Sequence, residues 1–244
     1  MTNKIIDYDE FHNTTSVQTK IIRNNNFTYK TILKIIDNYL GLSKNILDIG
    51  SGAGSLCLYY ANKGYKVLGL DISEKAVENA TQSARYLKLT NVKFTKMNFP
   101  EEIPNEKFDF IILTEVIEHL KDDNLAIKKI FSILNSKGML VISTPSQNAP
   151  LYRLGLAKEF DMKVGHLRRY TVKELKSLCL KNGFEVVYIK KTEGIIRNYL
   201  FINSFAGKLV RFIKFFISDI VMFIDNLTIP FSGESNIIIV ARKR

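Results

Sequence analysis

The chain has 244 residues, of which 46% are hydrophobic, and its formal net charge is +11. This length and composition exclude a disordered protein and allow a sizeable core. The two cysteines, Cys57 and Cys179, lack a C-x-x-C spacing, which argues against a disulfide framework and a zinc site and fits a reducing cytosol. The positive charge favours an anionic partner, such as nucleic acid, a membrane surface or a phosphorylated compound, although many lysine-rich surfaces have no such partner.

Residues 1–41 predict an N-terminal cap ahead of the first strand. The segment begins Met-Thr-Asn-Lys-Ile-Ile-Asp-Tyr-Asp-Glu, with acids where a signal peptide carries an apolar core, so we expect no export signal and a cytoplasmic protein. Apolar residues then recur at helical spacing over residues 27–40, and Gly41 closes the run. We expect this helix to pack on a sheet and to lie over its ligand-binding edge.

Residues 45–55, Asn-Ile-Leu-Asp-Ile-Gly-Ser-Gly-Ala-Gly-Ser, form the most informative stretch of the chain. A short apolar strand leads through three glycines into a predicted helix, which is how a parallel sheet presents a nucleotide site. Gly50 and Gly52, on either side of Ser51, allow a tight turn and a close approach to the ligand, and Gly54 allows the helix to pack close to the strand. The spacing G-x-G-x-G differs from the G-x-G-x-x-G of dinucleotide sites.

Asp48 lies in the strand just before these glycines. Its charge would repel a pyrophosphate but suits a ligand that carries an ammonium and a sulfonium. On these residues the loop resembles the S-adenosylmethionine loop of class I methyltransferases. An ordinary turn of an α/β domain and a dinucleotide site are the alternatives.

The next strand is predicted over residues 66–71 and ends in Asp71. An acid at this point can accept hydrogen bonds from both ribose hydroxyls of a nucleoside. Ile72 follows directly and is either an adenine contact or a core residue. A helix over residues 73–87, capped by its first residue, completes the unit.

A third strand is predicted over residues 92–96. The methyltransferase resemblance implies that a polar side chain shortly after it, here Asn98, hydrogen-bonds the adenine amino group. Phe99 can add an apolar contact. A loop asparagine and a core phenylalanine are the structural alternative.

A fourth, nearly all-apolar strand over residues 108–113 leads into Thr114 at the carboxyl edge of the sheet, where such sheets hold their ligands. Glu115, Glu118 and His119 are spaced i, i+3 and i+4, so a helical turn would aim them along one face. Such a group can supply a base, ligands for a hard cation, or a capping and surface cluster.

This run resembles the E-x-x-E-H segment of ubiquinone-biosynthesis O-methyltransferases and their relatives. In the quinone branch the resemblance implies that such residues help hold a divalent cation, but many relatives carry the same letters without a known metal, and we assign no metal ligand here. The chain has no Asn-Pro-Pro-Tyr or Asp-Pro-Pro-Phe after the strand. That absence argues against methylation of exocyclic base nitrogens and therefore against nucleic acid as a partner.

The segment over residues 145–170 is predicted to be a long substrate loop, since long loops at a ligand edge are usually functional. It ends in Gly-His-Leu-Arg-Arg-Tyr-Thr, which also resembles the substrate side of the quinone-type relatives. His166 is either a base for an acceptor hydroxyl or a structural hydrogen-bonding residue. Arg168, Arg169 and Tyr170 either bind an anionic substrate or hold the loop.

The remaining elements are predicted by their periodicity and end signals. They are a helix over 122–135, a strand over 139–143, a helix from the capping box of Thr171 and Glu174 to Gly183, and strands over 184–190 and 236–242. Between the last two strands, residues 195–231 form an insert with an unusually wide apolar face. Its longest uncharged run is too short to span a bilayer. It is predicted to be a hairpin over the substrate loop, a homodimer surface, or a cationic amphipathic helix on a membrane.

We therefore expect one doubly wound α/β domain over residues 1–244, and the resemblance implies a seven-stranded, mostly parallel sheet whose last strand is antiparallel. Its parts are the N-terminal helical cap (1–41), the cofactor-binding core (45–144), the substrate loop (145–170) and the apolar helical insert (195–232). The predicted activity is methyl transfer from S-adenosylmethionine to a small molecule, lipid-like or anionic, at a hydroxyl of a quinone or phenol, a sugar or a lipid-linked compound. Glu115, His119 and His166 supply the candidate base. RNA or protein methylation and a non-catalytic, membrane-peripheral scaffold are the alternatives.

Overall fold

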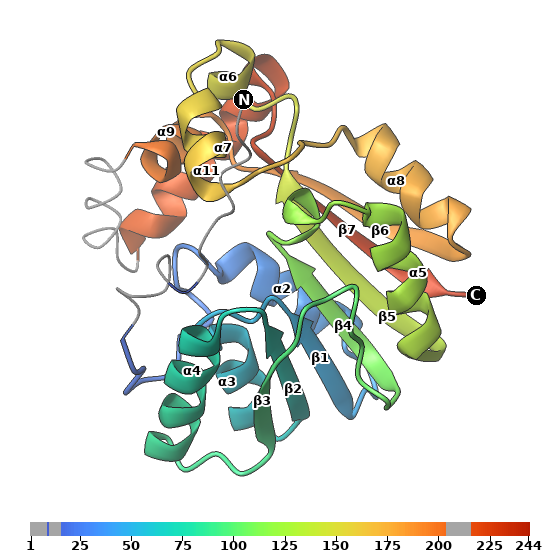
Figure 1. Ribbon diagram of the computed structural model, residues 1–244. Coiled ribbons are helices and arrows are strands. Elements are labelled where there is room, and N and C mark those ends of the chain that lie inside the picture. Colours follow the sequence, from blue (N-terminus) through green and yellow to red (C-terminus); the bar gives the residue numbers. More distant parts are fainter. Residues whose placement is uncertain (1–8, 10–15, 204–215) are drawn as a thin grey trace.

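The computed structural model describes residues 9, 16–203 and 216–244, and one seven-stranded sheet runs through it (Figure 1). The strands lie in the order β3-β2-β1-β4-β5-β7-β6. They are β1 (Asn45–Ile49), β2 (Lys66–Asp71), β3 (Val92–Lys96), β4 (Phe108–Thr114), β5 (Leu134–Pro145), β6 (Phe184–Thr192) and β7 (Asn236–Lys243). Neighbouring strands are parallel except that β7 is antiparallel to both β5 and β6. The predicted fold class is confirmed.

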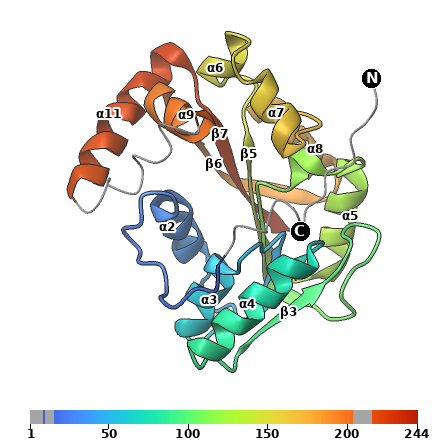
Figure 2. The same cartoon turned by 60° about the vertical axis from the view of Figure 1, so that its left-hand side comes forward.

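Helices cover both faces of this sheet and enclose two apolar cores (Figures 1 and 2). The helices are α2 (Lys30–Tyr39), α3 (Ser55–Asn62) and α4 (Glu74–Tyr86) on one face, and α5 (Asp123–Ile133) and α8 (Val172–Lys181) on the other. Ile36, Leu58 and Ala80 belong to the first core, and Ile127 and Leu175 to the second. Because both faces are covered, the central strands are apolar along most of their length.

The predicted helix starts are set by local side-chain caps. Ser73 accepts a hydrogen bond from the backbone N–H of Ala76 at the start of α4. Thr171 and Glu174 form the capping box expected at the start of α8. These caps satisfy backbone donors that have no partner inside the helix, so the local sequence fixes where the helices begin.

The structure differs from the sequence-based expectation between residues 134 and 170. β5 begins at Leu134 rather than Met139, because Leu134 already pairs with Phe108 of β4. The substrate loop, expected to be irregular, contains the short helices α6 (Pro150–Arg153) and α7 (Lys158–Val164). Pro150 in the first turn favours α6, and Gly165 in a left-handed conformation ends α7.

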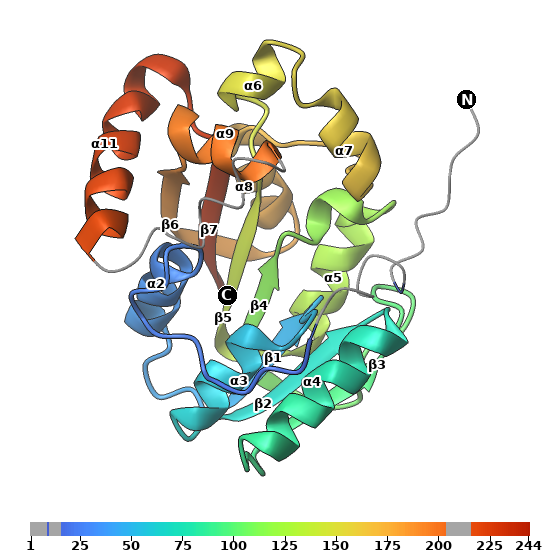
Figure 3. The same ribbon diagram turned by 90° about the vertical axis from the view of Figure 1, so that its left-hand side faces the viewer.

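The apolar insert forms two described helices, α9 (Ile195–Ile202) and α11 (Phe216–Ser232). They contact each other, and α9 contacts α6, beyond the ends of β5 and β6 (Figure 3). Lys208, Arg211 and Lys214, three basic residues of the insert, lie outside the described residues. Within the described ranges, no helix is both long and apolar enough to cross a membrane.

Candidate functional site

The candidate site lies where the strand order reverses, between β1 and β4. β2 and β3 lie on one side of β1, and β4 and the later strands lie on the other. At such a point the connections leave toward opposite faces of the sheet, which opens a crevice at the carboxyl ends of the two strands. The glycine loop follows β1 and the acidic segment 115–119 follows β4, so both predicted halves of the site border this crevice.

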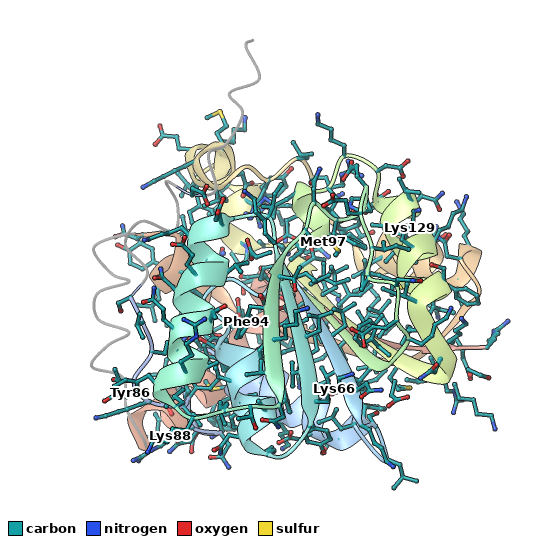
Figure 4. The ribbon with its side chains drawn as sticks, turned by 60° about the horizontal axis from the view of Figure 1, so that its bottom comes forward. Lys66, Tyr86, Lys88, Phe94, Met97 and Lys129 are labelled. Carbon is teal, nitrogen blue, oxygen red and sulfur yellow. The ribbon has the colours of Figure 1, made fainter. Side chains whose placement is uncertain are left out.

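Two glycines of the loop have no room for a side chain. Gly50 has a φ of 72° and Gly54 a φ of 80°, both in the left-handed region that favours glycine. A Cβ at Gly50 would lie 2.3 Å from Cγ2 of Val116, and one at Gly54 would lie 2.6 Å from Cζ of Phe94. Phe94 lies on β3 beside α4 (Figure 4). The close packing expected at Gly54 is therefore present, and Gly50 brings the loop against the segment after β4.

Asp71 holds the glycine loop in shape. Its Oδ2 accepts a 2.7 Å hydrogen bond from the backbone N–H of Gly52, and its Oδ1 accepts one of 2.9 Å from that of Ser73. Each carboxylate oxygen keeps a further lone pair, so ribose hydroxyls can still donate to it. Asp71 thus fixes the turn before any ligand binds, and its predicted role toward the ribose stays a prediction.

Asp48 is buried beneath the same loop. Its Oδ2 accepts a hydrogen bond from the Cys57 thiol at 3.3 Å, whereas its Oδ1 has no hydrogen-bond partner. Burial raises the pKa of Asp48 to about 7, and the charge of Asp71 adds to this rise while the Cys57 bond opposes it. The hydroxyl of Ser51 is likewise buried without a partner. These unsatisfied oxygens fit a ligand that brings N–H donors and positive charge, as the ammonium and sulfonium of S-adenosylmethionine would.

The other residues predicted to bind the cofactor differ in exposure. Ile72 and Asn98 are exposed, so both side chains are accessible to a ligand. Thr114 ends β4 and is half-buried. Phe99 is buried in the core beneath α5, which is the packing of the structural alternative, so an adenine contact from its ring has less support.

Glu115 does not lie on one helical face with Glu118 and His119, and that prediction is wrong. The helical turn is a 3-10 helix, η1 (Ile117–His119), which begins only after Glu115 has taken a left-handed φ of 55°. Oε1 of Glu115 accepts hydrogen bonds of 2.6 Å from the Ser143 hydroxyl and 2.7 Å from Nδ2 of Asn236. Partners on β5 and β7, distant in sequence, therefore turn Glu115 away from the helical face.

Glu118, His119 and His166 form a second group on the other side of that turn. One ligand atom from each side chain lies within 4.8 Å of the others. Glu118 is fully buried, with Oε2 accepting from Thr144 at 3.0 Å and Oε1 unpartnered at 3.9 Å from Nε2 of His166. The rings of His119 and His166 pack edge to face with their centroids 4.9 Å apart. The structure thus brings His119 and His166 together, as two candidate bases from segments far apart in the chain.

The pKa values of this group are shifted by burial. Burial, followed by the nearby charge of Glu115, raises the pKa of Glu118 well above its ordinary value. Burial and the neighbouring His166 lower the pKa of His119 to about 4. His119 is therefore neutral at physiological pH, and its Nδ1 lies 3.1 Å from the carbonyl oxygen of Gly165. Because a carbonyl only accepts, Nδ1 carries the proton and the Nε2 lone pair can serve as a base or a ligand.

The basic residues at the end of the substrate loop are occupied in holding that loop. Arg169 donates from Nε and an Nη atom to both carboxylate oxygens of Asp161, and Nδ1 of His166 lies 2.9 Å from the same carboxylate. Arg168 donates to the backbone of Lys121 and forms an ion pair with Asp123. Of the two interpretations left open by the sequence, loop-holding is the one that the contacts support, so an anionic acceptor gains no support from these arginines.

The sequence did not predict a role for Glu193, Arg197 or Asn236. Glu193 follows β6 with a left-handed φ of 64°. Arg197 of α9 is buried and pairs with Asp225 of α11. The only signal in the sequence was that Glu193 and Gly194 follow a predicted strand. The contacts between β4, β6 and β7 could not be predicted, because they depend on the order of the strands in the sheet.

Comparison with known proteins assigns a family to this arrangement. Residues 24–189 match the model of a methyltransferase domain family. A ubiquinone biosynthesis O-methyltransferase of Bartonella quintana is 33% identical over 149 residues, which cover 58% of this chain and 60% of that protein. A protein of the same name from Bradyrhizobium diazoefficiens is 32% identical over 111 residues, or 46% of this chain and 44% of that protein. The chain spans about half the length of the curated relatives it matches.

Solved structures show the same fold. The magnesium protoporphyrin IX methyltransferase (ChlM) of Synechocystis PCC 6803 with bound SAH superposes with a TM-score of 0.61 at 19% identity and covers 89% of this chain and 82% of that one. The family match, together with the seven-stranded sheet and the glycine loop, identifies a class I methyltransferase, a class whose cofactor is S-adenosylmethionine. The chain belongs to the methyltransferase domain family.

Proposed function

We propose that this protein transfers the methyl group of S-adenosylmethionine to a hydroxyl of a small molecule of the quinone or phenol class. The observation that carries the donor half is the preformed glycine loop, with the unsatisfied oxygens of Asp48 and Ser51 and the turn held by Asp71. The names of the relatives, ubiquinone biosynthesis O-methyltransferases, support the acceptor class. A sugar or a lipid-linked hydroxyl is the alternative acceptor.

In this proposal each cofactor-binding residue contacts a different part of S-adenosylmethionine. Asp48 balances the positive charge of the ammonium and sulfonium, Asp71 accepts from the ribose hydroxyls, and Ile72 packs on the adenine while Asn98 accepts from its amino group. The bound sulfonium is already an activated methyl donor. The protein therefore has mainly to align the donor carbon with the acceptor oxygen and to exclude water.

The acceptor hydroxyl must lose a proton as the methyl group arrives. Within the predicted set of Glu115, His119 and His166, the neutral His119 ring offers a lone pair on Nε2, and Glu115 is an exposed carboxylate held in place by two donors. His166 is tied to Asp161 and orients the pair. Glu115 and His119 are therefore the two candidate bases of this set, and substitution of each separately distinguishes them.

A divalent cation is an alternative use of Glu118, His119 and His166. The donor set suits a cation, because one carboxylate oxygen is unpartnered and one imidazole is neutral. A cation held there would lower the pKa of an acceptor hydroxyl. We expect transfer to survive exhaustive chelation. Loss of transfer on chelation, restored by a cation in the wild type but not in a His166→Ala variant, would instead assign a metal to this cluster.

The experiment that tests the proposal is incubation with S-adenosylmethionine labelled in the methyl group, together with a metabolite extract that contains soluble and lipid fractions. We expect label in a small organic product and not in macromolecules. Label in RNA or protein would favour those acceptors, and RNA binding would weaken steeply as salt rises. Cofactor binding without a labelled product would favour the non-catalytic scaffold.

Exposed apolar side chains support a lipid-like acceptor or contact with a membrane. On α11, Phe223 is 66% exposed, Leu227 56% and Phe231 91%, and on α7 Met162 is 72% exposed. In Figure 3 both helices lie beyond the end of the sheet that holds the crevice, α11 on the left and α7 on the right, with α9 between them. Exposed apolar patches of this kind mark interaction surfaces, and the net charge of +11 favours an anionic one.

Sedimentation with vesicles tests this surface. We expect the wild type to sediment with anionic vesicles, and a Phe223→Ser, Phe231→Ser variant to stay in solution. Leu42→Ser is the matched control, because Leu42 is 98% exposed but precedes β1 at the opposite end of the sheet. If the double variant instead abolishes a concentration-dependent dimer and vesicles have no effect, the surface is a homodimer interface.

A further inference from the structure

A carboxylate outside the predicted set follows β6, whose carboxyl end lies at the same end of the sheet as the crevice. Glu193 follows the last residue of β6, and its φ of 64° is rare for a residue with a side chain. Left-handed backbone at a non-glycine residue is energetically unfavourable, and such residues cluster at functional sites. The side chain is half-buried and accepts no hydrogen bond from any residue in the described ranges. Glu193 thus combines a strained backbone with a carboxylate that has no hydrogen-bond partner in the described ranges.

Asn236 connects Glu193 to Glu115. Asn236 begins β7, where it pairs with Thr192, the neighbour of Glu193, and with Pro145 of β5. The backbone N–H of Ser235 also donates to the carbonyl of Glu193 at 2.6 Å. The side chain of Asn236 is 9% exposed, donates from Nδ2 to Glu115, and has no partner for its Oδ1. The unsatisfied oxygen of this buried amide, whose nitrogen donates to Glu115, needs a donor that the described chain does not supply.

The apolar insert fixes the position of Glu193. Asp225 of α11 accepts hydrogen bonds from the backbone N–H groups of Gly194, Ile196 and Arg197, so it caps the start of α9. A Cβ at Gly194 would lie 2.1 Å from the Thr228 hydroxyl, so this turn is pressed against α11. Glu193 therefore lies at the junction of the sheet edge with the insert, and its backbone has little freedom to move.

From this geometry we propose that Glu193, Asn236 and Glu115 form the acceptor subsite, in which Glu193 takes the proton of the hydroxyl that is methylated. The proposal rests on the proposed function and deepens it, because it names the base and the class of acceptor. Two carboxylates and an amide select a neutral acceptor that donates hydrogen bonds, such as a phenol or a diol, and disfavour an anionic one.

The proposed step balances in atoms and charge. The acceptor O–H bond breaks and its proton passes to a carboxylate oxygen of Glu193, the acceptor oxygen forms a bond to the methyl carbon, and the carbon–sulfur bond of the sulfonium breaks with its electron pair left on sulfur. The products are a methyl ether, S-adenosylhomocysteine and a protonated Glu193, which returns its proton to water when the product leaves. No oxidant, reductant or further reactant is needed.

The ionisation of Glu193 suits a base at physiological pH. Burial raises its pKa to about 7, with Arg197 opposing the rise and the charges of Glu115 and Asp225 adding to it. These are the charged groups that face it from α9, from the end of β4 and from α11. A general base must be deprotonated and must still bind a proton well. A base whose pKa lies near the working pH meets both requirements.

The test compares Glu193→Gln with Glu185→Gln, since Glu185 lies at the other end of the same strand in an exposed pair with Arg242. The rate at which each variant transfers labelled methyl groups into the product identified with the wild type is measured between about pH 5.5 and 8.5. We expect Glu193→Gln to lower kcat by about 10²-fold or more and to abolish the rise in rate across pH 7, while Glu193→Asp restores part of both. Glu185→Gln should match the wild type, and all variants should bind S-adenosylmethionine equally in calorimetry.

The outcomes separate this inference from the function on which it rests. If the wild type transfers methyl groups and Glu193→Gln keeps both the rate and the pH profile, the inference is wrong and the proposed function stands. A lower rate with an unchanged pH profile gives Glu193 a structural role only and also contradicts the inference. If the wild type binds S-adenosylmethionine but labels no product, the proposed function fails and the inference fails with it.

Discussion

The two sides of the crevice are built in different ways. The donor side is made by residues close together in the chain, from Asp48 to Ser73, and its shape is set by glycines and by backbone donors to Asp71. The acceptor side joins β4, β5, β6 and β7, and the bond from Asn236 to Glu115 spans 121 residues. The donor side is therefore a local turn, whereas the acceptor side exists only when the sheet and the insert have assembled.

This difference suggests that the donor side is the constant part of the enzyme and the acceptor side the variable part. Local backbone geometry binds a cofactor that every member of the class shares. Long-range contacts can change their residues without disturbing the glycine loop, so they are suited to set the acceptor. Variants on each side should thus affect separate properties.

The largest effect is expected for Arg197→Ala, on the acceptor side. Arg197 and Asp225 are buried, and removal of the arginine leaves a carboxylate without its main charge partner. Breaking a buried pair in this way costs about 3 to 5 kcal/mol of folding free energy. Chemical denaturation should show this loss, whereas cofactor affinity measured on the folded fraction should stay unchanged.

The matched control is Arg242→Ala, which breaks an exposed pair with Glu185 between β6 and β7. An exposed pair is worth about 0 to 1 kcal/mol. Equal losses in Arg197→Ala and Arg242→Ala would contradict the view that the buried pair of Arg197 and Asp225 holds α9 and α11 together.

The second prediction concerns Asp48→Asn, on the donor side. The pKa of Asp48 is about 7 in the folded protein, above its ordinary value of 3.8. Between pH 3.8 and about 7, Asp48 therefore keeps its proton in the folded protein and has lost it in the unfolded chain. The stability from this proton is fully present below pH 3.8 and is lost as the pH rises through about 7. A neutral asparagine avoids that loss, so we expect the variant to be about 2 to 4 kcal/mol more stable than the wild type above neutral pH.

Melting curves without cofactor, across the pH range, measure this gain. The variant should also bind S-adenosylmethionine more weakly, because it lacks the charge that we propose balances the ammonium and sulfonium. Asp109→Asn is a control of opposite sign: burial alone would raise the pKa of Asp109, but bonds from Lys44, Asn45 and Asn135 lower it, so its substitution should destabilise at neutral pH. A pH-independent effect of Asp48→Asn would contradict the assigned cause.

The third prediction compares Gly54→Ala with Gly64→Ala. Both glycines have a left-handed φ, but a Cβ at Gly54 would meet Phe94 and Ala80, whereas one at Gly64 would meet nothing within 4 Å. The strained backbone costs about 1 kcal/mol in each, and forced overpacking adds about 1 to 3 kcal/mol in Gly54→Ala only. Denaturant midpoints measure the difference. Equal losses would show that the packing against β3 does not require glycine.

The sequence predicted the donor side well because its signals are local. The order of strand, glycine turn and helix, the acid at Asp71 and the cap at Ser73 are all visible in one stretch of chain. It also predicted that β7 runs antiparallel, although only through the family resemblance. The predicted ligand roles of these residues stay predictions.

The contacts on the acceptor side were not predictable from the sequence, for physical reasons. Helical spacing placed Glu115 with Glu118, but donors from Ser143 and Asn236 hold it in a left-handed conformation outside the helix. Nothing in the sequence indicated that Arg169 would form an ion pair with Asp161. The sequence could not show that Glu193 and Glu115 lie near each other, because this depends on the order of β5, β7 and β6. Tertiary contacts set that order, and no local preference encodes it.

The separation of the two sides is tested most directly by calorimetric titration of S-adenosylmethionine into the wild type, Asp71→Asn and Glu193→Gln. Asp71 holds Gly52, and in the proposed function it also accepts from the ribose, so its substitution should weaken binding by about 1.5 to 3 kcal/mol, or roughly tenfold or more. Glu193→Gln should bind as the wild type does. Unchanged affinity in Asp71→Asn, or a loss in Glu193→Gln as large as that in Asp71→Asn, would contradict the account.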